Sequence, residues 1–161
     1  MSFSEASDDD RRAVESLLGR PLAGRFAVVV RRRDGRPVVI ENEPHLRDGT
    51  PMPTLYWLVD TELTEAVSRL EGAGGVHRFE DLVDPGALVA THDAYARARE
   101  AATRRTDAPA PSGGVGGTRR GVKCLHAHLA YRLTGAADPV GELVAVELGV
   151  DVTQFVIDDR G

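Results

Sequence analysis

Residues 26–40 have the sequence Phe-Ala-Val-Val-Val-Arg-Arg-Arg-Asp-Gly-Arg-Pro-Val-Val-Ile, which is the clearest structural signal in the chain. Two β-branched runs flank Asp34-Gly35, a pair that supplies the positive φ angles of a tight hairpin turn. Pro37 lacks an amide donor, so the second strand is expected to begin there or to lie at a sheet edge. The sequence therefore predicts a β-hairpin. The four arginines around its tip are interpreted as a solvated tip, with an anion site as the alternative.

A second strand signal follows a rigid loop. Residues 43–53 contain three prolines and an Asp-Gly pair, which exclude regular structure. Residues 54–59 form the most aromatic segment of the chain, and we predict a central strand there. Such a constrained loop beside an aromatic strand is typical of a pocket wall, although a plain crossover fits equally well. As a pocket wall, the loop provides the candidate binding residues His45, Asp48, Thr50 and Thr54.

Most of the remaining chain has helical periodicity. Helices are predicted over residues 10–18, 61–70, 85–105, 122–133 and 139–148, with a short turn at residues 79–83. Thr61 is expected to cap the second helix. Residues 152–157 can add one edge strand. The predicted fold class is α+β, with a small, mostly antiparallel sheet (the hairpin and the aromatic strand) packed by four or five helices.

The chain of 161 residues is long enough for one well-packed domain. Residues 1–9 are polar and are expected to be a disordered N-terminus. Residues 10–161 are predicted to form a single domain. Within it, residues 106–121 are rich in Pro, Ala, Ser and Gly and are predicted to be a flexible linker, with an active lid as the alternative.

Charge and composition narrow the classes of function. Twenty-five acidic residues against twenty basic ones give a net charge of −5, which disfavours nucleic-acid binding. The apolar runs fall far short of the about 20 residues that span a bilayer, so no membrane association is expected. The acidic N-terminal residues lack the pattern of a signal peptide. A single cysteine excludes an intrachain disulfide and indicates a reducing, cytoplasmic location.

Residues 123–128, Lys-Cys-Leu-His-Ala-His, are the strongest candidates for chemistry. On a helix, Cys124 and His128 share a face and His126 points about 200° away from Cys124. A three-ligand metal site from this segment alone is therefore not expected, and no cofactor is predicted. In the first turn of a helix, free amides and Lys123 would lower the pKa of the Cys124 thiol, and His128 or His126 could act as a base. The alternative is a small buried cysteine beside hydrogen-bonded histidines.

Residues 113–121 form a glycine-rich segment before this helix. The segment lacks the Gly-Lys-Ser/Thr ending of a phosphate-binding loop, so it is a weak nucleotide signature. An anion held by Arg119, Arg120 and the start of the helix is the remaining interpretation.

Five short segments occur together in a specific combination: residues 18–21 (Leu-Gly-Arg-Pro), 48–58 (Asp-Gly-Thr-Pro-Met-Pro-Thr-Leu-Tyr-Trp-Leu), 69–71 (Arg-Leu-Glu), 122–127 (Val-Lys-Cys-Leu-His-Ala) and 139–141 (Pro-Val-Gly). Over roughly residues 10–148 the chain resembles domain-of-unknown-function family 501, which consists of actinobacterial cytoplasmic proteins and has no assigned activity. The resemblance implies a Cys-Pro pair before the hairpin glycine and another after the aromatic strand. This sequence has Arg32-Arg33 and Asp60-Thr61 at those places. If the family's cysteines form a shared metal or redox site, Cys124 is the only one of them that this chain has.

The leading hypothesis is a non-enzymatic binding or regulatory domain whose surface joins residues 44–54 to residues 123–128. Its partner would be an anionic small molecule or a protein. The alternative is a small hydrolase or transferase acting on a phosphorylated or acyl substrate, with Cys124 as nucleophile and arginines as anion clamps. A metal-binding domain is a third hypothesis.

Overall fold

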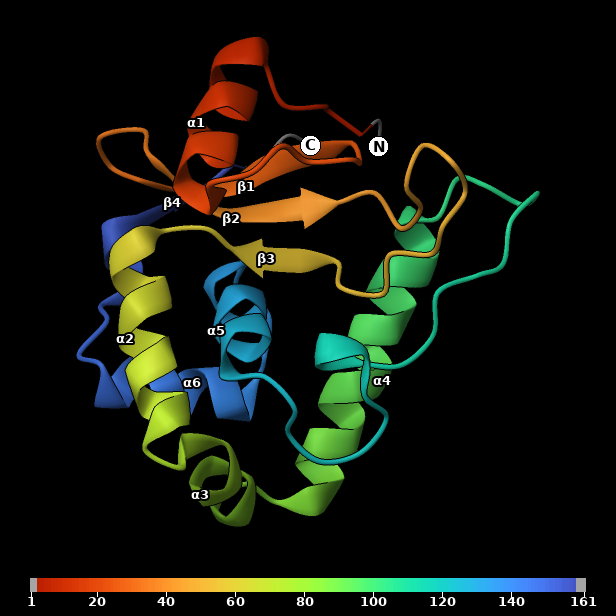
Figure 1. Cartoon of the computed structure of the whole chain (residues 1–161). Helices are drawn as coiled ribbons and strands as arrows, with labels where there is room; N and C mark the ends of the chain where they lie inside the picture. The colour runs from red at the N-terminus through yellow and green to blue at the C-terminus, as the bar shows by residue number, and fades with distance from the viewer. Residues whose placement is uncertain (1–2, 159–161) are drawn as a thin grey trace.

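A computed structural model describes residues 3–158 and confirms the α+β class. Its sheet has four antiparallel strands in the order β3-β2-β1-β4 (Figure 1). The strands are β1 (Phe26–Arg32), β2 (Pro37–Asn42), β3 (Tyr56–Leu58) and β4 (Phe155–Ile157). The hairpin and the additional strand near the C-terminus thus form as predicted.

The aromatic strand β3 lies at an edge of the sheet, so the prediction of a central position was wrong. It is three residues long and pairs with β2 through Val39 opposite Leu58 and Ile40 opposite Trp57. The strand with Pro37 at its start, β2, takes the inner position, because a proline at the first residue removes no interior ladder bond. The half-buried Tyr56 and Trp57 side chains are then available to form the wall of a site.

Six helices pack around the sheet in the described part of the chain: α1 (Asp8–Leu18), α2 (Thr61–Gly72), α3 (Gly75–Leu82), α4 (Pro85–Ala102), α5 (Leu125–Leu133) and α6 (Pro139–Glu147). The predicted turn at residues 79–83 is the end of α3. The helix predicted to end at residue 105 ends at Ala102. The N-cap of α2 is Asp60, whose side chain accepts from the Leu63 amide, and not Thr61 as predicted.

Two apolar clusters flank the sheet. Val14 of α1 packs on Phe26 and Ile40, while Leu58 belongs to a larger cluster with α2, α5 and α6. Val39 and Ile40 are neighbours on β2 and point to opposite faces of the sheet. Val39 therefore packs in the larger cluster and Ile40 in the cluster with α1. Figure 1 shows α2, α5 and α6 gathered below the strands, and α4 standing beside them.

Helix α4 holds the loop before β3 through buried polar side chains. The Tyr95 hydroxyl accepts hydrogen bonds from the amides of Leu55 (2.7 Å) and Tyr56 (3.1 Å). One turn further along, the Arg99 guanidinium donates to the Pro53 carbonyl at 2.9 Å. These bonds satisfy backbone groups that no neighbouring strand satisfies, so the loop enters β3 in one conformation.

The same face of α4 holds the glycine-rich segment. Arg99 also donates to the Gly113 carbonyl at 2.7 Å. The His92 ring accepts from the Val115 amide at Nδ1 and donates to the Gly121 carbonyl from Nε2. Both nitrogens of the ring are therefore hydrogen-bonded, one as an acceptor and the other as a donor. The side chain of Val115 is fully buried, so this half of the segment is packed against the body.

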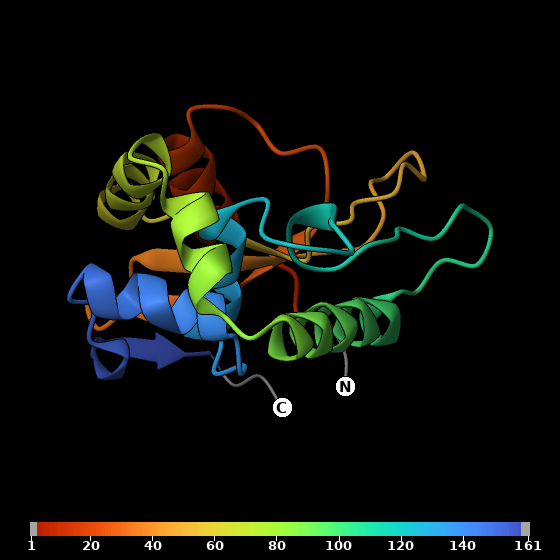
Figure 2. The same ribbon diagram turned by 90° about the horizontal axis from the view of Figure 1, so that it is seen from below.

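The flexibility of residues 106–121 stays a prediction. Their first part projects beyond α4, next to the tip of the loop at residues 43–53 (Figure 2). One contact joins the two loops there, between His45 Nε2 and the Pro109 carbonyl at 2.8 Å. Any flexible stretch is thus expected between Thr106 and Ser112, upstream of the part that α4 holds.

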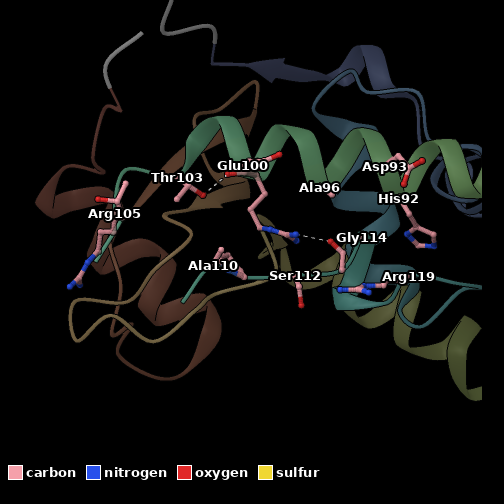
Figure 3. A pocket seen from close by; sticks show the side chains of 14 residues that line it. His92, Asp93, Ala96, Glu100, Thr103, Arg105, Ala110, Ser112, Gly114 and Arg119 are labelled. Atoms are coloured by element: carbon pink, nitrogen blue, oxygen red, sulfur yellow. Dashed lines mark hydrogen bonds between the residues drawn. The ribbon is translucent and has the colours of Figure 1, made fainter. Parts of the chain in front are cut away.

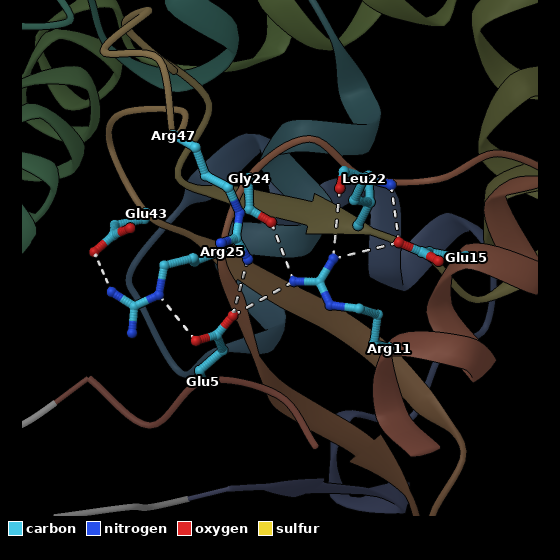
Figure 4. A network of polar contacts seen from close by, with 8 residues as sticks. All are labelled: Glu5, Arg11, Glu15, Leu22, Gly24, Arg25, Glu43 and Arg47. Atoms are coloured by element: carbon cyan, nitrogen blue, oxygen red, sulfur yellow. Dashed lines mark hydrogen bonds and ion pairs between the residues drawn. The ribbon is translucent and has the colours of Figure 1, made fainter. Parts of the chain in front are cut away.

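The N-terminal residues make specific contacts. Residues 1–2 of the predicted disordered segment lie outside the described residues. Glu5 lies between three arginines, Arg25 at 2.9 Å, Arg11 at 3.6 Å and Arg47 at 3.7 Å (Figure 4). Ser7 caps α1, which begins two residues before the predicted start.

The arginines at the hairpin tip bind groups of the protein itself. Arg31 forms two hydrogen bonds with Asp10, and Arg36 pairs with Asp34 in the turn. Arg32 reaches the carboxylate of Asp60 with two bonds, Nε–Oδ2 at 2.6 Å and Nη2–Oδ1 at 3.0 Å. Arg33 donates to the Thr153 carbonyl at 3.1 Å. Three of the four arginines thus have carboxylate partners within the protein, which disfavours an anion site at the tip.

We expect Tyr95→Phe to lower the free energy of unfolding by about 2 kcal/mol, because two buried amides lose their acceptor. Urea denaturation followed by circular dichroism measures this. Tyr131→Phe is the matched control, since that hydroxyl is bound to neither amide, and we expect a change below about 0.5 kcal/mol. Equal effects of the two substitutions would contradict the assigned role of Tyr95.

The Asp60–Arg32 pair makes stability depend on pH. Burial opposes ionisation of Asp60, but hydrogen bonds from Arg32 and the Leu63 amide outweigh it and hold the pKa of Asp60 below its ordinary 3.8. The stabilisation is therefore complete above that value and is lost as pH falls through the lower folded-state pKa. We expect Asp60→Asn to cost about 1–2 kcal/mol at pH 7 and progressively less at acidic pH.

The matched control is Asp34→Asn, which changes a more exposed pair with Arg36 and keeps the turn. Its cost is expected to be much smaller than that of Asp60→Asn at pH 7, because the pair is solvent-screened. Denaturation midpoints of the three proteins between pH 2.5 and 7 make the comparison. A constant difference between wild type and Asp60→Asn across this range would contradict the linkage.

Candidate functional site

Cys124 lies immediately before α5 and not within its first turn. Its backbone is extended (φ −147°, ψ 115°) and it occupies the N-cap position, whereas the prediction started the helix at Val122. The extended backbone also changes which histidine lies beside the thiol. The Cys124 Sγ is 3.9 Å from His126 Nδ1, so the predicted divergence of these two side chains was wrong.

His126 is half-buried between α5 and α2, and both of its ring nitrogens have partners. Nε2 lies 3.1 Å from the Thr64 carbonyl and 3.1 Å from the Ser68 hydroxyl. A carbonyl only accepts, so Nε2 carries a proton. Nδ1 faces Cys124 and the Glu71 carboxylate, whose Oε1 is 3.2 Å away. The hydrogen bond with Cys124 and the charge of Glu71 outweigh burial and raise the pKa of His126 to about 8.

Glu71, near the end of α2, joins the two helices. Its Oε2 accepts a hydrogen bond from the Leu125 amide at 2.8 Å and so supplies an acceptor for the first turn of α5. Its other oxygen faces His126. The side chains of Glu71, Cys124 and His126, hereafter the Glu71 cluster, place one oxygen, one sulfur and one nitrogen within 4.8 Å of one another.

His128 lies elsewhere, in the core. It is fully buried, and its Nδ1 is 2.7 Å from Asp138 Oδ2 at the N-cap of α6. Its ring lies 5.9 Å from that of His92. The structure therefore does not bring His128 and Cys124 together as a base and a nucleophile; the histidine ties α5 to α6 and packs against α4.

A pocket of about 320 Å³ adjoins Cys124 and His126 at the open edge of β3. Trp57 lies in its wall with Tyr56, and the chain following α1 contributes Arg20, whose guanidinium lies 5.4 Å from the Trp57 ring centre. Thr54 joins the same wall. This Trp57 pocket is the place where the loop ending at Thr54 meets the start of α5.

The other candidate residues of that loop have local roles. Asp48 Oδ1 accepts from the Thr50 amide at 2.9 Å, a turn bond that lowers the pKa of Asp48. His45 is buried against Pro109. None of these three residues, His45, Asp48 and Thr50, lines the Trp57 pocket.

A larger pocket of about 550 Å³ lies between α4 and residues 105–119 (Figure 3). The polar groups of His92 and Arg99 in its wall are occupied by the backbone bonds described above. Arg119 lines it and is exposed, and acidic side chains of α4, Asp93 and Glu100, lie among the lining residues. This mixture of charges favours neither anion nor cation, and most of its fixed polar groups already serve the fold.

The exposed Arg120 and Lys123 line neither of these two pockets. Sequence reasoning missed Arg20 and Trp57 as site residues, and it missed Glu71, which lies 53 positions before Cys124. The segment at residues 69–71 carried part of the family resemblance, and this was the one available signal for Glu71.

In the described part of the chain, no helix has both the length and the apolar character needed to cross a membrane. No curated protein and no solved structure shows significant similarity to the chain. The family model described as "Protein of unknown function (DUF501)" matches residues 28–146, which include most of β1, all of β2 and β3, Glu71 and the start of α5. The chain therefore belongs to the DUF501 family.

Proposed function

We propose that the protein is a cytoplasmic binding domain that holds a small anionic ligand with a planar apolar part in the Trp57 pocket. The observation that carries this proposal is the Arg20 guanidinium above the Trp57 ring at the mouth of a pocket. A pocket with aromatic walls and a few convergent polar groups is the usual form of a small-molecule site. The single cysteine of the chain supports the cytoplasmic part of the proposal.

Arg20 is suited to bind an anion because its charge is not already used. Within residues 3–158, no carboxylate lies at ion-pair distance from Arg20, in contrast to Arg11, Arg25 and Arg32 nearby. A guanidinium can bind a carboxylate or phosphate with two parallel hydrogen bonds and stack on an aromatic ring at the same time. A ligand bound beside the Arg20–Trp57 pair would use both properties.

Both aromatic residues of the wall are held by packing, Trp57 against the cluster of Phe26 and Ile40 and Tyr56 against rings of α4 and α5. The Tyr56 ring stacks on Tyr131 of α5 with centres 5.8 Å apart, and it meets Tyr95 of α4 edge-on at 6.1 Å. Burial among these rings raises the pKa of Tyr56 well above its ordinary value, so its hydroxyl stays neutral at physiological pH. A rigid wall reduces the entropy lost when a ligand binds.

The aromatic sulfonate 1-anilinonaphthalene-8-sulfonate has both of the required chemical features. We expect it to bind at one saturable site and to receive excitation energy from Trp57, the sole tryptophan of the chain. Arg20→Gln should weaken binding about tenfold, which corresponds to one lost charge-assisted contact of about 1.4 kcal/mol. Fluorescence titration measures both the affinity and the energy transfer.

Arg12→Gln is the matched control, because that arginine lies on the exposed surface of α1 and binds Asp9. It should leave the affinity unchanged. Equal affinities for wild type and Arg20→Gln, or binding without energy transfer from Trp57, would refute the proposed site.

A second candidate function is cysteine-dependent acyl transfer or hydrolysis, favoured by the 3.9 Å between Cys124 Sγ and His126 Nδ1. The Cys124 sulfur would attack an acyl carbonyl, the bond to the leaving alcohol would break, and the thiol proton would pass through His126 to that alcohol. The product on the enzyme is a thioester, which water or a second nucleophile then cleaves. In this candidate His126 takes the role of base.

The activated ester p-nitrophenyl acetate tests this candidate. Intact-mass analysis should show one acetyl group, which peptide mapping places on Cys124. His126→Gln should slow acetylation by about 10²-fold or more, the usual contribution of a general base. His77→Gln, at an exposed position of α3, is the matched control and should leave the rate unchanged. Acetylation of Lys123 instead of Cys124 would exclude the candidate.

A further inference from the structure

We propose that Glu71, Cys124 and His126 bind a zinc ion. The three side chains come from the end of α2 and the start of α5, and their ligand atoms lie within 4.8 Å of one another. They supply one carboxylate oxygen, one thiolate sulfur and one imidazole nitrogen. All three are common zinc ligands.

Two of the three distances between these atoms are close to the edges of a zinc tetrahedron. Bond lengths of about 2.3 Å to sulfur and about 2.0 Å to nitrogen and oxygen give S···N and N···O edges of about 3.5 and 3.3 Å. The corresponding distances are 3.9 Å between Cys124 Sγ and His126 Nδ1, and 3.2 Å between His126 Nδ1 and Glu71 Oε1. Shifts of a few tenths of an ångström would bring these two distances to tetrahedral values, and the sulfur–oxygen distance, which lies within 4.8 Å, would close to about 3.5 Å.

Outer contacts orient two of the three ligands. His126 donates from Nε2 toward the Thr64 carbonyl and the Ser68 hydroxyl, which leaves Nδ1 facing into the cluster. Metal-binding histidines are typically fixed in this way by a carbonyl on the other ring nitrogen. The Leu125 amide binds Glu71 Oε2 and leaves Oε1 for the ion.

In the metal-free protein a proton on His126 Nδ1 fills the place between the Glu71 carboxylate and Cys124, and a zinc ion would replace it. Among the described residues no arginine or lysine forms an ion pair with Glu71, although Lys123 is adjacent to Cys124 in sequence. A divalent ion in that place would also stabilise the thiolate form of Cys124.

The combination of one carboxylate, one thiolate and one imidazole favours zinc over other common metal ions. A thiolate with an imidazole disfavours magnesium and calcium, which prefer all-oxygen sites, and suits zinc. Three protein ligands leave a fourth position, as in catalytic zinc sites. Cys124 and His126 both line the Trp57 pocket, so this position would open toward it. The zinc site goes beyond the proposed ligand binding and does not require Arg20.

Cobalt(II) is the direct probe, because a tetrahedral cobalt–thiolate centre has visible d–d bands and a sulfur-to-metal charge-transfer band. We expect both bands to appear and to saturate at one equivalent of cobalt in the full chain without a histidine tag. Addition of one equivalent of zinc should abolish them. Cys124 is the only cysteine, so the charge-transfer band assigns the ligand.

Cys124→Ser, His126→Gln and Glu71→Gln should each weaken zinc binding by at least about 100-fold in competition with a chromophoric chelator, since loss of even an outer partner costs 10–100-fold. Glu65→Gln and His77→Gln, at exposed positions of α2 and α3, are the matched controls and should bind zinc like wild type. Circular dichroism verifies that each variant is folded.

A cobalt complex of the wild-type chain without the charge-transfer band would overturn the proposal even if a variant failed to fold. Zinc affinity equal to wild type in all three cluster variants would also overturn it. Arg20→Gln separates this proposal from the ligand pocket, because that substitution should leave zinc affinity unchanged while it weakens binding of the aromatic sulfonate.

Discussion

One buried polar face of α4, formed by His92, Tyr95 and Arg99, holds two loops that have little regular hydrogen bonding of their own. Arg99 is 4% exposed and donates to backbone carbonyls of both loops, and burial lowers its pKa. A buried cation bound only to neutral carbonyls costs more in desolvation than one paired with a carboxylate. The two loops that this planar, multidentate donor fixes together, at residues 53 and 113, offset that desolvation cost.

The candidate site depends on this arrangement, although no residue of that face belongs to it. The first loop leads into Trp57, and the second leads through Gly116 to Cys124. Gly116 has a φ of 69°, and a Cβ at this position would lie 3.6 Å from that of Cys124, so the segment passes close beside the thiol in a conformation that favours glycine. The edge position of β3 then matters, because a further strand there would occupy the space of the Trp57 pocket.

Local signals predicted the hairpin, the edge strand near the C-terminus and most helices, because turn chemistry and apolar periodicity act over a few residues. They failed at Cys124. Its segment has leucines at helical spacing, but the chain stays extended until the Leu125 amide meets Glu71, a contact across 54 positions that periodicity does not encode. The same contact reverses the expected positions of the two histidines. His126, and not His128, lies beside Cys124, and His128 packs in the core.

The two places where the family resemblance implies cysteines are side by side in space, since Arg32 and Asp60 bind each other there. They lie at the N-terminus of α2, whereas Glu71 lies near its opposite end. Eleven residues of α-helix separate Asp60 from Glu71 by about 16 Å, and metal ligands lie within about 2.3 Å of a zinc ion. Cysteines at these two places could not bind the same ion as Glu71. The Glu71 cluster is therefore separate from any site at the hairpin tip. The Arg32–Asp60 ion pair, which stands in place of those cysteines, removes none of the three proposed zinc ligands.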